Sequence, residues 1–174
     1  QYTYPEAIKY IANKYNIEVE ETERTPEQIS EDNEKESLFQ VSDFAKNYFK
    51  KNLFEKEGKT IALSYLKERK FKGDIIEKFE IGYSVKSKDN FSRAAIDAGY
   101  KLNFLEKTGL TIVKDSENID RFRGRVVFPI KSMSGRILGF GGRILGSSKN
   151  LAKYINSPES LIYQKSKVLY GIYE

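Results

Sequence analysis

The chain has 174 residues, 39% of them hydrophobic, and a formal net charge of +5 at pH 7. This is the size of one domain, or of one domain with a tail, and it holds enough apolar side chains for a core. Cysteine and histidine are absent, which excludes a disulfide framework, a thiol nucleophile, a Cys/His zinc site and a Ser-His-Asp triad within this sequence. No apolar run approaches the roughly 20 residues of a membrane span, and we expect a monomeric, cytoplasmic protein outside the membrane.

The first 36 residues divide into a helical part and an acidic part. Residues 1–16 are expected to form a short amphipathic helix, since Ile8, Ile11 and Tyr15 recur at helical spacing. A helix so close to the first residue suggests a piece cut from a longer protein. Residues 18–36 contain nine acidic residues against two basic ones. This segment is either a solvated linker or an acidic decoy that folds back on the basic part of the chain.

Helical periodicity returns at Ser37. It predicts a helix whose apolar face contains Leu38, Val41, Ala45, Tyr48 and Phe49. Gly58 is expected to break the chain, and Thr60 to cap a second helix. A third, short helix is expected to begin at Gly73.

The next elements alternate between strand, helix and loop. Residues 79–83 have the alternation of a half-buried strand. Asn90 is placed to cap a further helix, which Gly99 would end. Residues 114–120 are expected to form a loop.

Most of the positive charge lies at the end of the chain. Residues 121–174 carry ten Lys or Arg against two acids, a net charge of about +8. Two runs with strand composition, 126–130 and 136–140, flank a turn signal at 132–135, which predicts a hairpin. A rigid hairpin carrying cationic side chains offers a surface for a polyanion. With helices first and strands later, the fold class is α+β: a helical N-terminal half followed by a basic, mixed or antiparallel sheet.

Arg121, Phe122 and Arg123 form the sharpest local motif. In an extended segment residues i and i+2 point to one face, so both guanidiniums would project together while Phe122 enters the core. The two arginines either grip adjacent phosphates or form salt bridges with Asp115, Glu117 or Asp120; both interpretations remain open.

The glycines of residues 139–143 do not form a nucleotide loop, because the Lys-Ser/Thr pair and the following helix are missing. A glycine-rich strand that lets another backbone or a ligand approach closely is the better interpretation, with Arg143 reaching that ligand.

In residues 153–159 a cation, an aromatic ring and an amide suit a single nucleic-acid strand. The alternative is an ordinary turn with Tyr154 in the core. Lys165 is by default a solvated lysine. No clustered carboxylates for metal-dependent catalysis occur in the basic half, so we assign no catalytic or metal-binding residue.

These motifs resemble the bacterial DnaG-type DNA primase family. The resemblance rests on residues 121–130, 135–143, 153–159 and 169–174, in the family's order and spacing, and upstream on Tyr65-Leu66, Arg69, residues 79–83 and Asp89-Asn90. It implies that residues 1–36 are a helix from the end of the zinc-binding domain plus the acidic linker. Residues 37–174 are then the N-terminal subdomain of the RNA polymerase core.

The resemblance also implies a function. The family makes short RNA primers on single-stranded DNA from nucleoside triphosphates. This subdomain would hold the template and the RNA–DNA hybrid in a basic groove beside a TOPRIM active site, which is absent from this chain. Mg²⁺ would belong to that TOPRIM subdomain, Zn²⁺ to the zinc-binding domain, and contact with the replicative helicase to a C-terminal region. The implied DNA-binding residues are Arg69, Arg121, Arg123, Arg143, Lys153, Tyr154, Asn156 and Lys165.

Two other functions remain open from the sequence. The chain is either a non-enzymatic single-stranded-DNA-binding module of another replication or repair protein, or its basic face docks a protein such as the replicative helicase. Competition between a protein partner and DNA for the same arginines would favour the docking surface.

Overall fold

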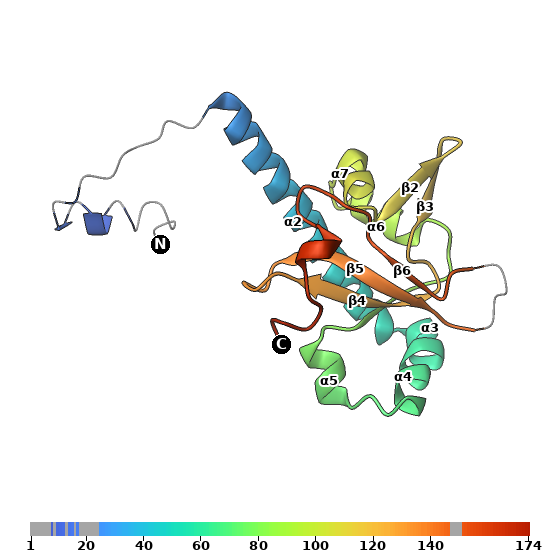
Figure 1. The fold of residues 1–174 in the computed structure, drawn as a ribbon. Coiled ribbons are helices and arrows are strands. Elements are labelled where there is room, and N and C mark those ends of the chain that lie inside the picture. Colours follow the sequence, from blue (N-terminus) through green and yellow to red (C-terminus); the bar gives the residue numbers. More distant parts are fainter. Residues whose placement is uncertain (1–7, 9, 13, 16, 18–24, 147–150) are drawn as a thin grey trace. The chain divides into compact units, whose positions relative to one another are not determined.

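The computed structural model describes residues 8, 10–12, 14, 15, 17, 25–146 and 151–174 (Figure 1). It divides into two compact units, residues 1–32 and 33–174. In the first unit Ile8, Lys14 and residues 10–12 are helical, as predicted, and Ala12 is buried. Tyr15, also part of the helix predicted over 1–16, lies in a turn. The other residues of that helix, and the acidic segment as far as Arg24, lie outside the described residues.

Helix α2 (Pro26–Leu53) begins well before the predicted start at Ser37. Its first turn is a capping box: the Gln28 backbone N–H donates to Thr25 Oγ1 at 3.3 Å, and the Thr25 N–H donates to Gln28 Oε1 at 3.0 Å. Proline at the first helical position adds to this start signal. Residues 26–36, which were interpreted as part of an acidic linker, are therefore helical, and most of their side chains are exposed. The predicted apolar positions Leu38, Val41, Ala45 and Phe49 are buried.

A nearly continuous helical segment follows α2. It consists of α3 (Lys56–Gly58), the π-helical turn η1 (Lys59–Leu63) and α4 (Ser64–Glu68), and α5 (Gly73–Lys78) comes after it. Gly58 does not break the chain as predicted: it is buried inside this segment, where an added Cβ would lie 2.0 Å from the Asn52 carbonyl oxygen. Thr60 does not cap a helix either, because its hydroxyl donates within the segment to the Lys56 carbonyl at 2.9 Å. The short helix from Gly73 is confirmed.

A four-stranded antiparallel sheet, in the order β1-β4-β5-β6, forms the centre of the second unit. The predicted hairpin is confirmed as β4 and β5, and Phe128 is opposite Gly141, which is opposite Asn156. The strands are β1 (Gly82–Ser84), β4 (Arg125–Lys131), β5 (Ile137–Ile144) and β6 (Tyr154–Asn156). The strand predicted over 79–83 starts only at Gly82, since Glu80 has a φ of 49° that ends the preceding helix.

The segment between β1 and β4 contains two helices and a second hairpin. These elements are α6 (Asn90–Asp97), α7 (Leu102–Lys107), β2 (Thr111–Lys114) and β3 (Glu117–Asp120). The predicted loop 114–120 is therefore a strand and a tight turn, in which Asp115 and Ser116 have φ values of 51° and 63°. Two successive residues at positive φ are typical of the type I′ turn that suits a two-residue hairpin.

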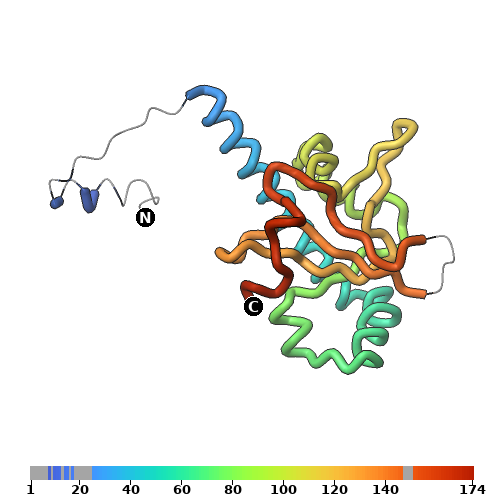
Figure 2. Tube along the Cα trace, in the orientation of Figure 1, coloured from blue at the N-terminus to red at the C-terminus, as the bar shows by residue number. Residues whose placement is uncertain are grey.

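The two faces of the sheet have different partners. Figure 2 shows α2 passing behind β4 and β5, and there Phe49 packs edge-on against Phe140 of β5, with ring centroids 5.7 Å apart. Phe49 also lies 5.2 Å from Phe91 of α6, which completes this core. On the opposite face Val126 packs with Leu66 of α4 and other residues of the segment 53–83. That segment covers one end of the face, and the rest of the face is available for a site.

The N-terminus of α6 is capped from β3. The carboxylate of Asp120 accepts the backbone N–H groups of Phe91 at 2.7 Å and Ser92 at 3.0 Å, and the Ser92 hydroxyl at 2.6 Å. Asn90, the predicted cap, is the first helical residue, and its amide donates to the Tyr48 hydroxyl instead. Burial raises the pKa of Asp120, and the hydrogen bonds from Ser92 and Phe91 oppose that rise. Gly99, with a φ of 90°, follows the helix as predicted.

Replacing Asp120 by alanine is expected to lower the free energy of unfolding by about 2 kcal/mol, since it leaves buried N–H and hydroxyl groups without their acceptor. Asp120→Asn keeps one carbonyl oxygen and should lose less. Urea denaturation followed by circular dichroism measures both variants. Equal losses for alanine and asparagine would show that hydrogen bonding by residue 120 does not stabilise α6.

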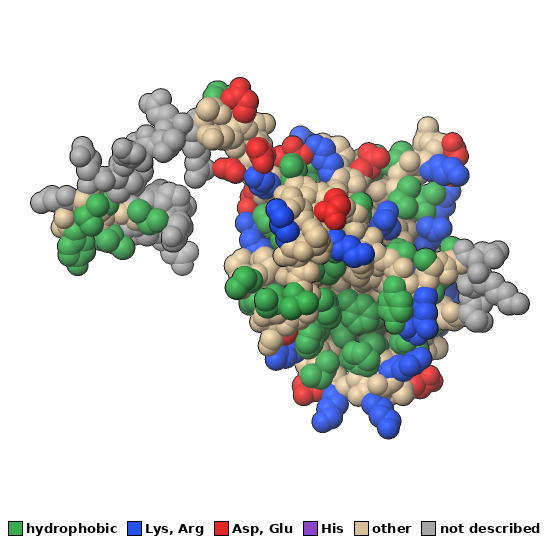
Figure 3. Space-filling model, viewed as in Figure 1, with side chains coloured by type: hydrophobic (Ala, Val, Ile, Leu, Met, Phe, Trp, Pro, Cys, Tyr) green, Lys and Arg blue, Asp and Glu red, His purple; other side chains and the backbone are tan. Residues whose placement is uncertain are grey.

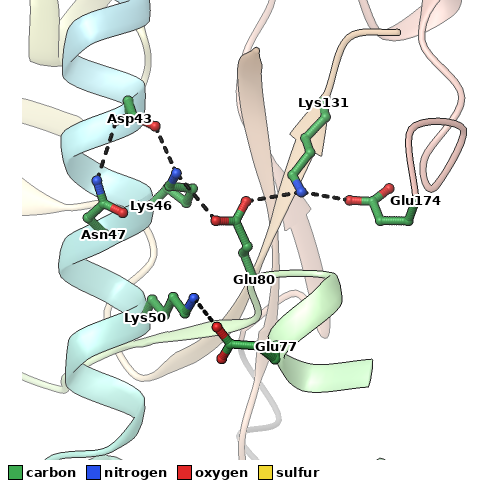
Figure 4. Close-up of polar contacts among 8 residues, drawn as sticks. All are labelled: Asp43, Lys46, Asn47, Lys50, Glu77, Glu80, Lys131 and Glu174. Atoms are coloured by element: carbon green, nitrogen blue, oxygen red, sulfur yellow. Dashed lines mark hydrogen bonds and ion pairs between the residues drawn. The ribbon is translucent and has the colours of Figure 1, made fainter. Parts of the chain in front are cut away.

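A chain of ion pairs connects α2, the sheet and the end of the chain (Figure 4). Lys131 of β4, whose side chain is 5% exposed, lies 3.0 Å from carboxylate oxygens of both Glu80 and Glu174. The second Glu80 oxygen is 3.3 Å from Lys46 Nζ, which in turn is 2.9 Å from Asp43. Burial acts to lower the pKa of Lys131, but its hydrogen bonds to Glu174 and Glu80 outweigh burial, and the pKa is raised. This chain of charges fixes the last residues against the sheet.

Candidate nucleic-acid interface

An open groove of about 420 Å³ lies on the sheet face that carries Phe128, Gly141 and Asn156. Strand register places these residues side by side, and the C-terminal segment that includes the 3₁₀ turn η2 (Lys165–Lys167) forms the opposite wall. The view in Figure 3 shows hydrophobic side chains gathered over the middle of this molecule, with Lys and Arg side chains around them. The groove is lined by Phe128, Ile130, Gly141, Tyr154, Asn156, Tyr163, Lys165, Val168 and Tyr170.

The glycines of β5 make room for this groove. A Cβ on Gly141 would lie 3.3 Å from Asn156 Oδ1, and a Cβ on Gly139 would lie 3.1 Å from Ser157 Cβ and 3.3 Å from Tyr163. The sequence predicts that these glycines let another backbone or a ligand approach closely; in the structure, side chains of β6 and of the chain beyond it lie against Gly139 and Gly141. Gly141 itself is part of the groove wall.

Arg143 lies beyond Gly141 on the same face, between two tyrosine rings. Its guanidinium carbon is 5.1 Å from the ring centre of Tyr154, its cross-strand neighbour, and 5.2 Å from that of Tyr65 on α4. It also donates a hydrogen bond to the Tyr154 hydroxyl. The guanidinium of Arg69 lies 5.6 Å from the same Tyr65 ring. Cations within about 6 Å of a ring centre are attracted to its face, so the predicted residues Arg69, Arg143 and Tyr154 belong to one cluster.

Tyr154, Asn156 and Lys165 all line the groove. In the sequence, an ordinary turn and a solvated lysine were the alternative interpretations of these residues. Tyr154 is 61% exposed, so the alternative that it is a core residue is wrong. Lys153 is exposed and directly precedes β6. Lys165 begins η2, where its backbone N–H donates to Glu159. Burial raises the pKa of Tyr170, which lies across the groove from β6, to about 12, so this ring is uncharged at neutral pH.

Arg121 and Arg123 are not arranged as predicted. Their segment is a turn and not an extended strand, since Gly124 with a φ of 67° reverses the chain before β4. Arg121 Nε donates to the Asn156 carbonyl at 3.2 Å, and an Arg123 guanidinium N–H donates to the Asp120 carbonyl at 3.2 Å. Within the described part of the chain, the alternative salt bridges to the acids of residues 115–120 are also not formed. Arg121 therefore lies beside β6 and Arg123 beside β3, and neither lines the groove.

Two neighbours of these arginines are structural. Phe122 is 1% exposed and packs against Phe140, as predicted for an anchor, and it fills the space where Gly142 lacks a side chain. Arg125, which sequence reasoning did not single out, is 5% exposed and donates to the Ala152 carbonyl at 3.0 Å. Burial lowers its pKa, and the charge of Arg123 adds to that effect. In the sequence, the only indication of this role is that Arg125 stands two residues after Arg123. Arg125 fixes the start of β6 and thereby the tyrosine that follows.

The groove and the arginine cluster beside it together offer three kinds of chemistry. Aromatic rings can stack on exposed bases, the Asn156 amide can bind base edges, and Lys165, Arg69 and Arg143 can bind phosphates. Over residues 25–146 and 151–174, together with the few described before them, no group of three or more acidic, Cys or His residues could hold a metal ion. None of the helices formed by these residues is long and apolar enough to cross a membrane.

Comparison with known proteins gives consistent matches. The family model described as DNA primase catalytic core, N-terminal domain, matches residues 48–174. A DNA primase from Halalkalibacterium halodurans is 35% identical over 175 residues, covering 99% of this chain and 28% of that protein. The chain thus spans little more than a quarter of the length of this curated relative.

Solved structures match over most of the chain. A DnaG primase catalytic domain bound to single-stranded DNA has a TM-score of 0.72 and 33% identity, covering 81% of this chain and 43% of that one. The zinc-binding and RNA polymerase domains of the Aquifex aeolicus primase have a TM-score of 0.72 and 27% identity, covering 99% of this chain and 40% of that one.

Proposed function

Because the chain belongs to the DNA primase family, as the N-terminal domain of the catalytic core, we propose that it is the template-binding part of a primase that synthesises RNA primers on single-stranded DNA. The single-stranded template lies along the groove between β6 and the C-terminal segment. One observation carries this proposal: Tyr154, Asn156 and Lys165 line one groove, beside a cluster that contains Arg69 and Arg143. A similar catalytic domain that was solved with single-stranded DNA supports it.

The proposal divides the work between this chain and parts outside it. The groove holds the template and the RNA–DNA hybrid, and phosphoryl transfer from nucleoside triphosphates takes place in a TOPRIM subdomain with Mg²⁺. Zinc belongs to a zinc-binding domain, and the replicative helicase contacts a C-terminal region. The enzyme acts in the cytoplasm. Lys153, Arg121 and Arg123 contribute positive charge beside the groove and not within it.

We expect this chain to bind a short, fluorescently labelled single strand with an affinity that falls as salt rises, because phosphate contacts release counterions. Tyr154→Ala should weaken binding roughly 5- to 150-fold, the range for one stacked base. Tyr154→Phe keeps the ring and should lose much less. Fluorescence anisotropy at several salt concentrations measures all three proteins.

The outcomes separate the alternatives. Wild-type protein that fails to bind even at low salt would contradict the groove as a template site in this chain. Binding that is unaffected in a folded Tyr154→Ala variant would place the nucleic acid elsewhere on the basic surface. A protein partner that competes with the strand for the same residues would favour the docking function.

A further inference from the structure

Tyr65 lies where the sheet face meets α4. Its ring is half-buried against the cluster that includes Leu66 and Val126. The guanidiniums of Arg69 and Arg143 lie over this same ring, 5.6 and 5.2 Å from its centre. The sequence predicts both arginines as DNA-binding residues, whereas Tyr65 is only one of the residues that carry the family resemblance.

The two arginines form a concentrated positive charge without a carboxylate. Within residues 25–146 and 151–174, neither Arg69 nor Arg143 makes an ion pair, although other cations such as Arg136 and Lys131 do. The Nε atom of Arg143 is buried and has no hydrogen-bond partner there, and one terminal nitrogen donates to the Tyr154 hydroxyl, so the other terminal nitrogen remains to bind a ligand. Two like charges held near one ring repel each other unless an anion joins them. An anion with several oxygens, such as a phosphate group, matches two guanidiniums.

The backbone before Tyr65 contains a π-helical turn, which changes the direction in which the Tyr65 side chain points. The π-helical turn η1 (Lys59–Leu63) ends directly before α4, and the Ser64 hydroxyl donates to the Lys59 carbonyl, five residues earlier. A π turn takes up one extra residue and so rotates everything after it around the helix axis. Tyr65 of α4 and Arg69, the residue directly after α4, are four positions apart and lie on the same side of the helix axis. Arg143 of the sheet meets Tyr65 there.

We propose that Tyr65 is a positioning residue that holds Arg69 and Arg143 as a pair for one backbone phosphate of the bound strand, and so extends the nucleic-acid path from the sheet groove to α4. This inference rests on the proposed function. Tyr65 supplies the shared aromatic face that keeps two like charges together, and the phosphate supplies the missing counter-charge. Its own hydroxyl has no part in this role.

The test is the affinity of the 174-residue chain for a short single strand across a salt series. Tyr65→Leu is expected to weaken binding roughly 5- to 30-fold, the equivalent of losing the cation–π contacts. It should also lower the slope of log affinity against log salt by about one. Tyr65→Phe should bind like the wild type. Tyr65→Met is a second non-aromatic variant in case leucine disturbs the neighbouring core, and thermal unfolding monitors the fold of each.

A double-mutant cycle identifies how Tyr65 acts. In an Arg69→Gln/Arg143→Gln background, Tyr65→Leu should have no further effect if the ring works only through these arginines. A full tyrosine effect in that background would overturn the proposal, since the ring would then contact the strand itself. Wild-type affinity and slope in folded Tyr65→Leu would also overturn it, while leaving the groove intact. Failure of the proposed template site itself is a different result: the wild-type chain would then not bind the single strand at all.

Discussion

Arg143→Glu is expected to weaken binding of single-stranded DNA roughly 100-fold at low salt. The substitution removes a guanidinium between Tyr65 and Tyr154 and places a carboxylate facing the phosphates, which costs about 3 kcal/mol of binding free energy. Arg143→Gln, which removes charge without reversing it, should lose less and lower the salt slope by about one. Fluorescence anisotropy with a labelled single strand measures each affinity.

A matched control separates the site from the net charge. Lys114→Glu makes the same change in charge on an exposed residue of the β2–β3 hairpin, outside the groove lining. It should change the affinity only slightly, because charges beyond about 10 Å are largely screened at ordinary salt. If Lys114→Glu and Arg143→Glu weaken binding equally, the protein attracts DNA through its overall charge, and Arg143 is not part of a specific site.

Lys131→Met should lower the free energy of unfolding by about 3 kcal/mol near pH 7, the largest stability loss we predict. The reason is that the Lys131 ammonium is shared by Glu80 and Glu174, and the Glu174 side chain is only 4% exposed. Without the lysine, the Glu80 and Glu174 carboxylates lose the positive charge that offsets the cost of burying them. Urea denaturation measures the loss. Lys50→Met is the control, since the Lys50–Glu77 pair at 2.6 Å is more exposed and should contribute less than about 1 kcal/mol.

The effect of Lys131→Met should depend on pH. Burial acts to raise the pKa of Glu80, but Lys131 and Lys46 together hold it below its ordinary value of 4.5. A carboxyl group whose pKa is lower in the folded protein stabilises the fold at pH values above its pKa in the unfolded chain. This stabilisation is lost as the pH falls through the pKa of the folded state. In the variant, protonation of Glu80 as the pH falls removes the cost of burying its charge. The difference between wild type and variant should therefore shrink from pH 7 to pH 4. A difference that is constant with pH would point to lost packing by the lysine stem instead.

The sequence by itself determined the local elements and the chemistry of the site. The apolar period of α2, the hairpin of β4 and β5, and the turn glycine after α6 follow from spacing and from backbone preferences that act over a few residues. The α+β class and the resemblance to primases were also readable from the sequence. The Thr25 and Gln28 spacing of the capping box is also present in the sequence, in a segment whose acidic composition favours a linker.

Only the tertiary structure decided which of these residues meet. Arg69 and Arg143 are far apart in the chain, and the π turn before α4 and the strand pairing of β5 bring them to one tyrosine ring. The spacing of Arg121 and Arg123 suggested a pair of phosphate ligands, but Gly124 turns the chain and both donate to backbone carbonyls. Asp120 was a candidate salt-bridge partner for these arginines, and it is a helix cap. Such roles depend on contacts between distant segments, which packing of the whole core fixes and local periodicity does not encode.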